Sequence, residues 1–324
     1  MDNNIRLSII IPFYNVEQYI AQCLDSVYQQ DIAEDEYEVI CVNDASPDHS
    51  RDIVLEYQKK HSNLVLVEHD VNNKLGAARN TGMKVATGRY IWHVDSDDMI
   101  VPNCLKTIVT LCDEKQLDVL EFGYVETNNR SSVILREPVR GTDVLTGQDY
   151  IERYYLPNFG TICPVWRRVY RHEFLENNHI ISPPINMGED EAFSVHVFSL
   201  AQRVAFEPQD FYVHRINGSS LVGENKKSWS ANKWYEASMD CPRYIHSVFQ
   251  SIKPVIAKDI QYAIQNMIVY DILYFDVFVS DFSQEAWNHY WRLCRKNLIR
   301  NRFVIRYLSR KKIIKYLKYI FKFQ

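Results

Sequence analysis

The chain has 324 residues, of which 46% are hydrophobic and 13% aromatic, so it can bury a substantial core and is not an intrinsically disordered protein. Its 41 acidic and 37 basic side chains give a formal net charge of −4, which argues against a nucleic-acid partner because such proteins present a basic face. The seven cysteines include no C-x-x-C pair, and this favours reduced core thiols over a disulfide framework or a zinc site.

The N-terminus shows no targeting signal. Its first residues lack a cationic segment followed by an apolar one, and no run of about 18 apolar residues is present to cross a bilayer. The sequence therefore predicts a cytoplasmic protein.

The N-terminal third alternates short apolar strands with helices. Apolar runs predict strands over 7–11, where Pro12 ends the run, and over 37–42, 64–67 and 89–94. Helical spacing of apolar residues predicts helices over 16–28, 48–60 and 75–86. This order predicts an α/β fold with a mainly parallel twisted sheet and flanking helices, whose ligands bind at the carboxyl ends of the strands.

Polar side chains stand at three of these strand ends, in residues 12–15, 43–46 and 95–97. Asp95 and Asp97 are two positions apart, so on an extended backbone their side chains leave on the same side. Two neighbouring carboxylates suit a hard divalent cation that shares its coordination shell with substrate phosphates. The alternative is an acidic turn in which Asp97 or Asp98 caps a helix that begins near Val101.

The common nucleotide-binding signatures are absent from the sequence. It contains neither G-x-G-x-x-G after the first strand nor G-x-x-x-x-G-K-[ST], and no H-E-x-x-H. A phosphate-carrying ligand would then need a metal ion and an arginine, and Arg79 is well placed to supply the latter.

Four ordered motifs together resemble the family 2 glycosyltransferases, of the type that builds bacterial surface polysaccharides. They are Ser-Ile-Ile-Ile-Pro-Phe-Tyr-Asn at 8–15, Asn-Asp-Ala-Ser-Pro-Asp at 43–48, Gly-Ala-Ala-Arg-Asn-Thr-Gly at 76–82, and Ala-Thr-Gly-Arg-Tyr-Ile at 86–91 before the Asp-x-Asp pair. The resemblance is dense over 7–102 and continues in fragments to about 220. It implies a GT-A fold, a nucleotide-sugar donor, Mn²⁺ or Mg²⁺, and inversion at the anomeric carbon.

The resemblance also implies roles for individual residues. Tyr14 contacts the base, Asp44 accepts a hydrogen bond from the uracil imide, and Arg79 lies near the diphosphate. The alternatives are a core aromatic for Tyr14, an Asx turn before Pro47 for Asp44, and a solvated helix face for Arg79. The donor-binding residues implied in this way are Pro12, Tyr14, Asn15, Asp44, Arg79, Asp95, Ser96 and Arg215.

For the metal, the resemblance implies Asp95 and Asp97 as ligands, with His214 completing the shell; alternatively, His214 is a structural histidine. Residues 187–191 open a predicted amphipathic helix, and their Glu-Asp pair maps the catalytic base onto Asp190, with Glu189 as a substitute. The alternative is that these acidic residues only favour the first turn of a helix.

Two positions depart from the family pattern. Ala45 and Lys74 stand where the family usually carries glycine, and Gly76 is expected to restore the backbone freedom that Lys74 removes.

The chain divides into a predicted glycosyltransferase domain, 1–225, and a helical C-terminal region, 226–324. Within the domain, residues 5–125 form the nucleotide half and 126–225 the acceptor half. Twelve of the basic residues lie between Arg292 and Lys322, and the helix over 311–322 places lysines on one face and apolar residues on the other. This pattern predicts peripheral contact with an anionic membrane at the inner face of the plasma membrane, or else a helix packed on the body.

The sequence thus predicts an inverting glycosyltransferase of class EC 2.4. It transfers a sugar, from a UDP-sugar by default, to a glycan or lipid-diphosphate-linked hydroxyl in capsule or lipopolysaccharide synthesis. The alternatives are an inactive homologue that binds a nucleotide-sugar, and a sugar-phosphate nucleotidyltransferase. The latter usually carries a glycine-rich loop after its first strand, and residues 12–15 are not such a loop.

Overall fold

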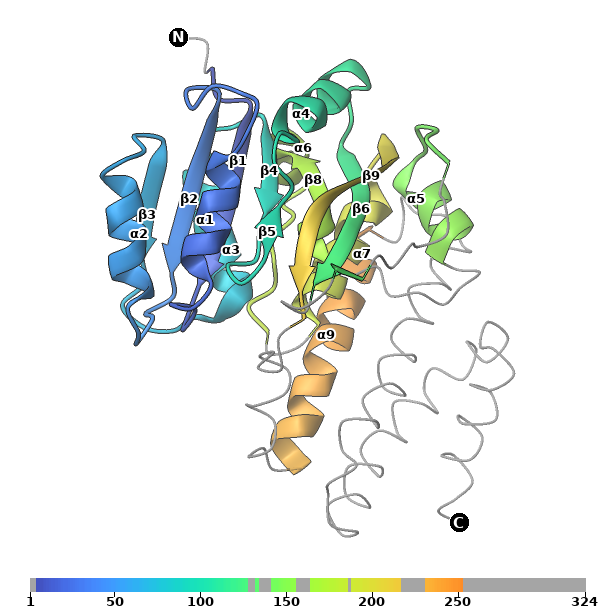
Figure 1. The fold of residues 1–324 in the computed structure, drawn as a ribbon. Helices are drawn as coiled ribbons and strands as arrows, with labels where there is room; N and C mark the ends of the chain where they lie inside the picture. Colours follow the sequence, from blue (N-terminus) through green and yellow to red (C-terminus); the bar gives the residue numbers. More distant parts are fainter. Residues whose placement is uncertain are drawn as a thin grey trace.

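The computed structural model describes residues 4–127, 132–133, 141–155, 164–185, 188–216 and 231–252. One sheet with the strand order β3-β2-β1-β4-β8-β6-β9-β5, with β7 paired to β6, forms the centre of this described part. Helices cover both faces of the sheet (Figure 1). The predicted α/β class with flanking helices is therefore confirmed.

The first four strands of the sheet order form a parallel block. β1 pairs with both β2 and β4, and β2 pairs with β3. The connecting helices match the predicted alternation to within a few residues at each end. The bounds are β1 Leu7–Phe13, α1 Ile20–Tyr28, β2 Tyr37–Asn43, α2 Ser50–Gln58, β3 Leu64–Glu68, α3 Lys74–Val85 and β4 Tyr90–His93.

The expectation that Pro12 ends the first strand is wrong, since β1 continues through Pro12 to Phe13. The Ile10 carbonyl accepts from Val94 on the β4 side, and β4 pairs with β1 only as far as Ile10. Residues two apart point the same way, so the missing N–H of Pro12 faces the side where β4 has already ended. Proline is tolerated at such an unpaired position.

The second half of the sheet is mixed. β8 runs antiparallel to both β4 and β6, whereas β6 and β9 are parallel and β5 pairs antiparallel with β9. The bounds of its strands are β5 Met99–Ile100, β6 Val119–Thr127, β7 Ser132–Val133, β8 Arg168–Arg171 and β9 Val204–Arg215. Its helices are α4 Leu105–Glu114, α5 Gly147–Tyr150, a π-helical turn Ile151–Tyr155, a 3₁₀ turn Val165–Arg167, α6 His172–Asn177, α7 Glu189–Leu200 and α9 Ala231–Ile252.

The helix that follows the Asp-x-Asp pair begins later than the sequence suggested. α4 starts at Leu105 after Cys104, so neither Asp97 nor Asp98 caps it, and the interpretation of this acidic turn as a helix cap is wrong.

Two hydrophobic cores lie on opposite faces of the sheet. One contains residues of α1, α2 and α4, and the other contains residues of α3, α5, α6, α7 and α9. The helix predicted to be amphipathic, α7, is instead buried on every side from Glu191 to Ser199. It is covered because α5 and α9 pack against it in addition to the sheet.

Five cysteines, Cys23, Cys41, Cys104, Cys112 and Cys241, lie in the described part of the chain, and all are buried thiols outside any disulfide there. This confirms for them the prediction of core thiols. Within the described ranges, no helix has both the length and the apolar character needed to cross a membrane. The predicted basic helix over 311–322 lies outside the described residues.

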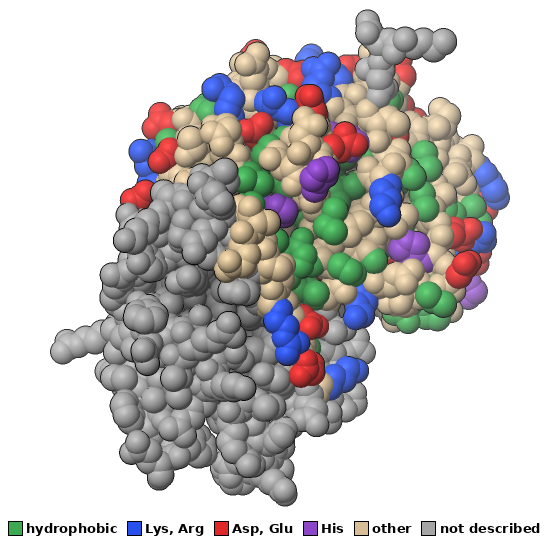
Figure 2. Space-filling view, turned by 180° about the vertical axis from the view of Figure 1, so that it is seen from behind, with side chains coloured by type: hydrophobic (Ala, Val, Ile, Leu, Met, Phe, Trp, Pro, Cys, Tyr) green, Lys and Arg blue, Asp and Glu red, His purple; other side chains and the backbone are tan. Residues whose placement is uncertain are grey.

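The face opposite to that of Figure 1 mixes hydrophobic, acidic and basic side chains (Figure 2). Among the described residues no single sign of charge dominates this face, so electrostatic function depends on local clusters of side chains.

Candidate active site

The three predicted polar segments meet at one edge of the sheet. β1, β2 and β4 are parallel and neighbouring, so the residues that follow them lie side by side. Pro12 and Ser96 are buried, whereas Tyr14 and Asn15 are exposed at this edge. Tyr14 is 38% exposed, which excludes its interpretation as a core aromatic.

The loops after β1 and β2 are joined by hydrogen bonds. The Asn15 N–H donates to the Ser46 hydroxyl at 2.8 Å, and the Glu17 N–H donates to Asp48 Oδ2 at 2.8 Å. Burial alone would raise the pKa of Asp48, but its hydrogen bonds with Ser46, Ser50 and Glu17 lower the pKa instead. The two loops therefore form one surface around the predicted base pocket.

Asp44 is held by groups from the next strand end. Its Oδ1 accepts from the Asn73 N–H at 2.8 Å and lies 2.7 Å from His69 Nδ1. His69 Nε2 in turn lies 2.9 Å from the Thr81 hydroxyl. Within the described residues, both of these contacts fall on Asp44 Oδ1. His69 was not predicted, although it follows β3 just as Asp44 follows β2.

Both departures from the family pattern have left-handed backbone. Ala45 has φ +58° and Lys74 has φ +74°, a region that glycine adopts without steric cost. Gly76 does not relieve Lys74, contrary to expectation. A Cβ on Gly76 would lie 2.2 Å from the Pro183 carbonyl oxygen, so this glycine permits α3 to approach the segment that precedes α7.

Arg79 connects the two halves of the site. Its side chain is fully buried, so its interpretation as part of a solvated helix face is wrong. Nη2 donates to Asp95 Oδ1 at 3.0 Å, and Nη1 donates to Asp190 Oδ1. Burial alone would lower the pKa of Arg79, but Asp190, Asp95 and Glu189 raise it. The guanidinium is thus permanently charged and holds two predicted site carboxylates together.

The carboxylates around Arg79 outnumber it. Burial raises the pKa of Asp95 to about 6, against the opposing effect of Arg79 and with help from Asp190 and Asp97. Burial and the charges of Asp95 and Asp97 raise the pKa of Asp98 to about 8. This clustering is a local excess of negative charge, which a divalent cation would relieve.

Asp190 lies at the start of α7. Its Oδ1 accepts from Arg79 and its Oδ2 from the Val165 N–H at 3.3 Å. Its neighbour Glu189 has its pKa raised to about 7 by burial and by the Asp190 charge. Gly188 before them has φ +76°, and a Cβ there would lie 2.7 Å from Cys241 Cβ. The position of the acidic pair therefore depends on contact with α9.

His214 and Trp166 belong to one aromatic stack. The ring of Trp166 stacks on Tyr212 at 4.3 Å and on His214 at 5.3 Å, and Trp166 is only 6% exposed. His214 Nδ1 lies 3.4 Å from Glu126 Oε1. Within the described ranges, no three His, Cys, Asp or Glu side chains are grouped to hold a metal ion. Asp95, Asp97 and His214 therefore do not form such a group, and the role of His214 stays a prediction.

The oxygen donors of Asp95 and Asp97 nevertheless fit Mn²⁺ or Mg²⁺. Such ions commonly bind through one or two carboxylates and complete their shells with substrate phosphates and water. The excess negative charge around Asp95 agrees with this chemistry.

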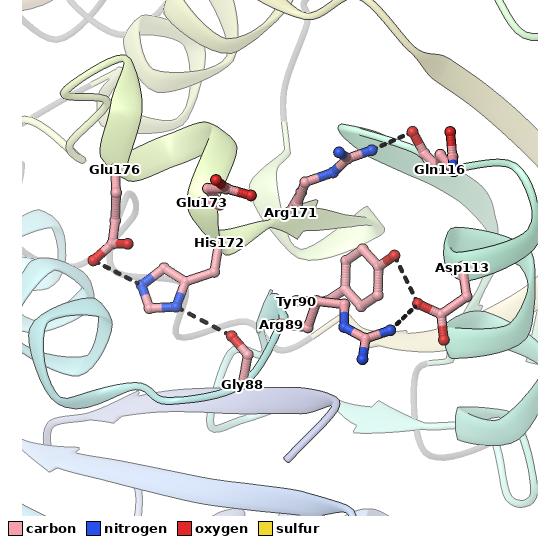
Figure 3. A pocket seen from close by; sticks show the side chains of 9 residues that line it. All are labelled: Gly88, Arg89, Tyr90, Asp113, Gln116, Arg171, His172, Glu173 and Glu176. Atoms are coloured by element: carbon pink, nitrogen blue, oxygen red, sulfur yellow. Dashed lines mark hydrogen bonds and ion pairs between the residues drawn. The ribbon is translucent and has the colours of Figure 1, made fainter. Parts of the chain in front are cut away.

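A hollow also lies elsewhere on the described part of the chain. A cavity of about 560 Å³ opens at the opposite edge of the sheet, where β4 begins. Figure 3 shows that its charged groups face one another: Tyr90 and Arg89 point to Asp113, and His172 lies between Glu176 and the Gly88 carbonyl. These groups are already paired, and they lie far from the carboxyl ends of the strands. The reaction is therefore not assigned to this cavity.

The chain is similar to known glycosyltransferases. A family model described as Glycosyl transferase family 2 matches residues 8–194. The uncharacterized glycosyltransferase EpsJ of Bacillus subtilis is 33% identical over 67% of this chain and 62% of its own length. A poly(ribitol-phosphate) beta-glucosyltransferase of Bacillus spizizenii is 32% identical over 64% of this chain and 32% of its own length. The chain thus spans less than two thirds of the length of both relatives.

A solved structure shares the fold. The crystal structure of S. aureus TarS 1-349 in complex with UDP-GlcNAc aligns with a TM-score of 0.72 at 22% identity, over 98% of this chain and 90% of that one. This agreement confirms the predicted GT-A architecture. The family model matches more than half of the chain's residues, so the chain belongs to glycosyltransferase family 2.

Proposed function

We propose that this chain transfers a sugar from a UDP-activated donor to a hydroxyl group of a glycan or lipid-diphosphate-linked acceptor in surface-polysaccharide synthesis. The observation that carries the proposal is the pairing of Asp95 and Asp190 with the buried Arg79, with the charge of Asp97 near Asp95, at the carboxyl ends of parallel strands. The names of the relatives support the reaction class, since one is a poly(ribitol-phosphate) beta-glucosyltransferase. The structural neighbour was solved with UDP-GlcNAc, which supports a uridine nucleotide.

The donor would lie along the edge formed by the loops after β1 and β2. Tyr14 is exposed there for contact with the base, and Asp44 presents an oxygen for the uracil imide N–H. Asp95 and Asp97 would hold Mn²⁺ or Mg²⁺, which when bound neutralises charge on the leaving diphosphate. Asp95 and Asp97 are only partly buried, which leaves room for phosphate oxygens.

Asp190 acts as the general base in this proposal. The acceptor oxygen forms a bond to the anomeric carbon while the bond from that carbon to the diphosphate oxygen breaks, and the acceptor proton moves to a carboxylate oxygen of Asp190. A carboxylate has about four lone-pair sites, so Asp190 can accept this proton while Arg79 and the Val165 N–H hold it in place. Attack from the face opposite the diphosphate inverts the centre, so an α-linked donor yields a β product.

Arg79 would keep the base and the donor-side carboxylate in a fixed relation. It contacts both Asp95 and Asp190 and is completely enclosed. A buried guanidinium with two carboxylate partners has little freedom to move. We therefore expect the donor site and the acceptor site to be aligned before substrates bind.

The first experiment is the thermal stability of wild type and Asp97→Asn with UDP, with and without Mn²⁺. Ligand at 100 times its Kd adds about 2.7 kcal/mol of stability, so wild type should show a metal-dependent shift that Asp97→Asn loses. Glu176→Gln is the matched control, since it removes an exposed carboxylate at the opposite edge of the sheet. A shift with GDP or dTDP and none with UDP would overturn the uridine assignment, and no shift with any nucleotide would overturn the donor site itself.

Release of UDP from UDP-GlcNAc and from UDP-glucose then tests the reaction itself. Wild type should release UDP faster when an acceptor hydroxyl is supplied, and the new linkage should be β. Release of pyrophosphate from a nucleoside triphosphate and a sugar phosphate would instead identify a nucleotidyltransferase.

A further inference from the structure

Two sequence motifs that lie far apart in the chain meet at Asp98. The first is the acidic turn of residues 95–98, and the second is the end of β9, Tyr212 to Arg215. Asp98 Oδ2 accepts from the Tyr212 hydroxyl at 2.8 Å, and Asp98 Oδ1 accepts from the Arg215 N–H at 2.7 Å. Asp98 is only 2% exposed, so these contacts are shielded from water.

The Tyr212 hydroxyl continues the network to the first carboxylate of the turn. It accepts from the Asp95 N–H at 3.1 Å while it donates to Asp98. Tyr212 is fully buried, and its ring stacks on Trp166 at 4.3 Å. Because packing fixes the ring, the hydroxyl fixes the backbone of Asp95.

Arg215 holds the other side of the same turn. Its Nε donates to the Asp97 carbonyl at 2.8 Å, and its Nη2 donates to Gln22 Oε1 on α1 at 2.7 Å. The guanidinium also lies 5.2 Å from the centre of the Tyr19 ring. From the end of β9, Arg215 thus joins Gln22 of α1 to the peptide of Asp97.

The turn also closes on itself and on β9. The Asp98 N–H donates to the Asp95 carbonyl at 3.0 Å. The residues that follow the turn form β5, which pairs with β9. In this pairing Met99 lies opposite Val213 and Ile100 lies opposite Tyr212. The acidic turn is therefore fixed at both ends against the strand that supplies Tyr212 and Arg215.

Asp98 itself is badly placed to be a ligand for a cation. Both of its oxygens accept hydrogen bonds from protein groups and it is buried, whereas the Asp95 side chain is 26% exposed. A buried carboxylate is costly unless it is hydrogen-bonded, and here the hydrogen bonds it receives come from the very groups that hold the neighbouring carboxylates. The role of Asp98 is to hold the backbone of the turn through hydrogen bonds.

We propose that Asp98, Tyr212 and Arg215 are positioning residues that hold the backbone of residues 95–97 in the conformation that binds a metal and a nucleotide diphosphate. This inference rests on the proposed function for the identity of the ligand. Outer groups that orient metal ligands typically contribute about 10–100-fold to metal affinity. The turn then binds its ligand without first having to order itself.

Tyr212→Phe tests the proposal because it removes one hydroxyl and keeps the stacked ring. We expect the Mn²⁺ concentration that gives half of the UDP-dependent thermal shift to rise about tenfold, with metal-free UDP binding unchanged. Tyr90→Phe is the matched control. Tyr90 is also buried, and its hydroxyl donates to the Asp113 carboxylate at 3.0 Å, at the opposite edge of the sheet (Figure 3). Equal metal dependence in both variants and wild type would overturn the proposal.

A second measurement needs neither metal nor nucleotide. Amide hydrogen exchange in the segment 92–100 of the unliganded protein should be faster in Tyr212→Phe than in wild type or Tyr90→Phe, because the Asp95 N–H loses its acceptor. Asp98→Asn, which replaces an acceptor oxygen by an amide, should have the same effect. If exchange in this segment is unchanged in both variants, the positioning role is wrong even where wild type binds UDP and Mn²⁺. If wild type binds no nucleotide but exchange rises in the two variants as expected, the positioning role is supported and the proposed ligand is wrong.

Discussion

The two halves of the sheet build their parts of the site in different ways. In the parallel block β3-β2-β1-β4, each polar segment directly follows the strand that positions it, as Asn15, Asp44 and Asp95 do. In the mixed half, β8-β6-β9-β5, the key groups are held by residues distant in the chain. Asp190 is bound by Arg79, 111 positions earlier, and Asp98 is bound by Tyr212, 114 positions later.

This difference separates two kinds of site. The donor half follows each strand and the loop after it, apart from the acidic turn 95–98, which Tyr212 and Arg215 also hold from β9. The acceptor half is organised by tertiary contacts, and Arg79 is the residue that links it to the donor half. Substitutions in the donor half should therefore affect UDP binding, and substitutions in the acceptor half should affect transfer. Substitutions at Arg79 should affect both.

The largest effect is expected from Asp190→Asn. Removing a general base typically costs about 10²–10⁴-fold in rate, and because the donor half is organised locally, UDP should bind the variant with nearly wild-type affinity. The measurement is the rate of UDP release with acceptor, alongside the UDP-dependent thermal shift. Transfer near the wild-type rate would remove Asp190 from its role, and Glu189→Gln would then be the next variant to examine.

Arg79→Lys should disturb both halves. A lysine keeps the charge but cannot bind Asp95 and Asp190 at once in the same fork-like geometry. A misplacement of about 1 Å near the reacting groups can cost about 10²-fold, so we expect transfer to fall by that order and UDP affinity to fall as well. The rate of transfer and the UDP titration measure the two effects.

Arg168→Lys is the control for this variant. Arg168 is also fully buried, and it donates to Glu121 at 2.7 Å and to Ser194 at 2.9 Å. It should lose stability as Arg79→Lys does, while transfer by the folded protein persists. A loss of transfer in both variants at equal stability would mean that Arg79 matters only for folding.

The same contrast explains what sequence reasoning could predict. The strands and helices of the parallel block, and the gathering of Asp44, Asp95 and Asp97 at one edge, follow from apolar periodicity and strand order. The continuation of β1 past Pro12 does not follow from the sequence, because it depends on where the neighbouring strand β4 ends.

In the mixed half, tertiary contacts override local patterns. α7 looked amphipathic in the sequence, but α5 and α9 cover it, so it is buried on every side. Arg79 and Trp166 illustrate the same limit, since no local pattern shows that one is enclosed by two carboxylates and the other by two aromatic rings. Asp98 adjoins the predicted motif, yet its role depends on Tyr212, a partner that spacing alone does not identify.

The pH dependence of stability should report the clustered carboxylates that both halves bring to the site. Asp95, Asp98 and Glu189 have pKa values raised from their ordinary values near 4 to about 6, 8 and 7. The folded protein therefore holds protons that the unfolded chain releases near pH 4. The contribution of these three groups to stability is greatest below that pH and falls as pH rises, because the unfolded state then binds fewer protons.

We accordingly expect the melting temperature of the unliganded protein to fall between pH 5 and pH 8. Mn²⁺ with UDP should flatten this fall, since a cation favours the ionised carboxylates. Melting curves across this range, with and without both ligands, are the measurement. A melting temperature that rises with pH in the unliganded protein would contradict the clustering of negative charge at the site.

The smallest effect concerns two loop residues of the donor half. Lys74 has φ +74° and Ala45 has φ +58°, and a left-handed conformation costs a residue with a Cβ about 1–2 kcal/mol. Glycine removes this cost but gives the unfolded chain more freedom, worth about 0.4–1 kcal/mol. Lys74→Gly and Ala45→Gly should each therefore raise the free energy of unfolding by up to about 1 kcal/mol. Lys84→Gly and Ala77→Gly are the matched controls within α3, where glycine should instead destabilise by about 0.5–1 kcal/mol. If Lys74→Gly and Ala45→Gly destabilise as the controls do, the side chains at 74 and 45 make contacts worth more than the strain they impose, and the donor half is then not set by local backbone geometry alone.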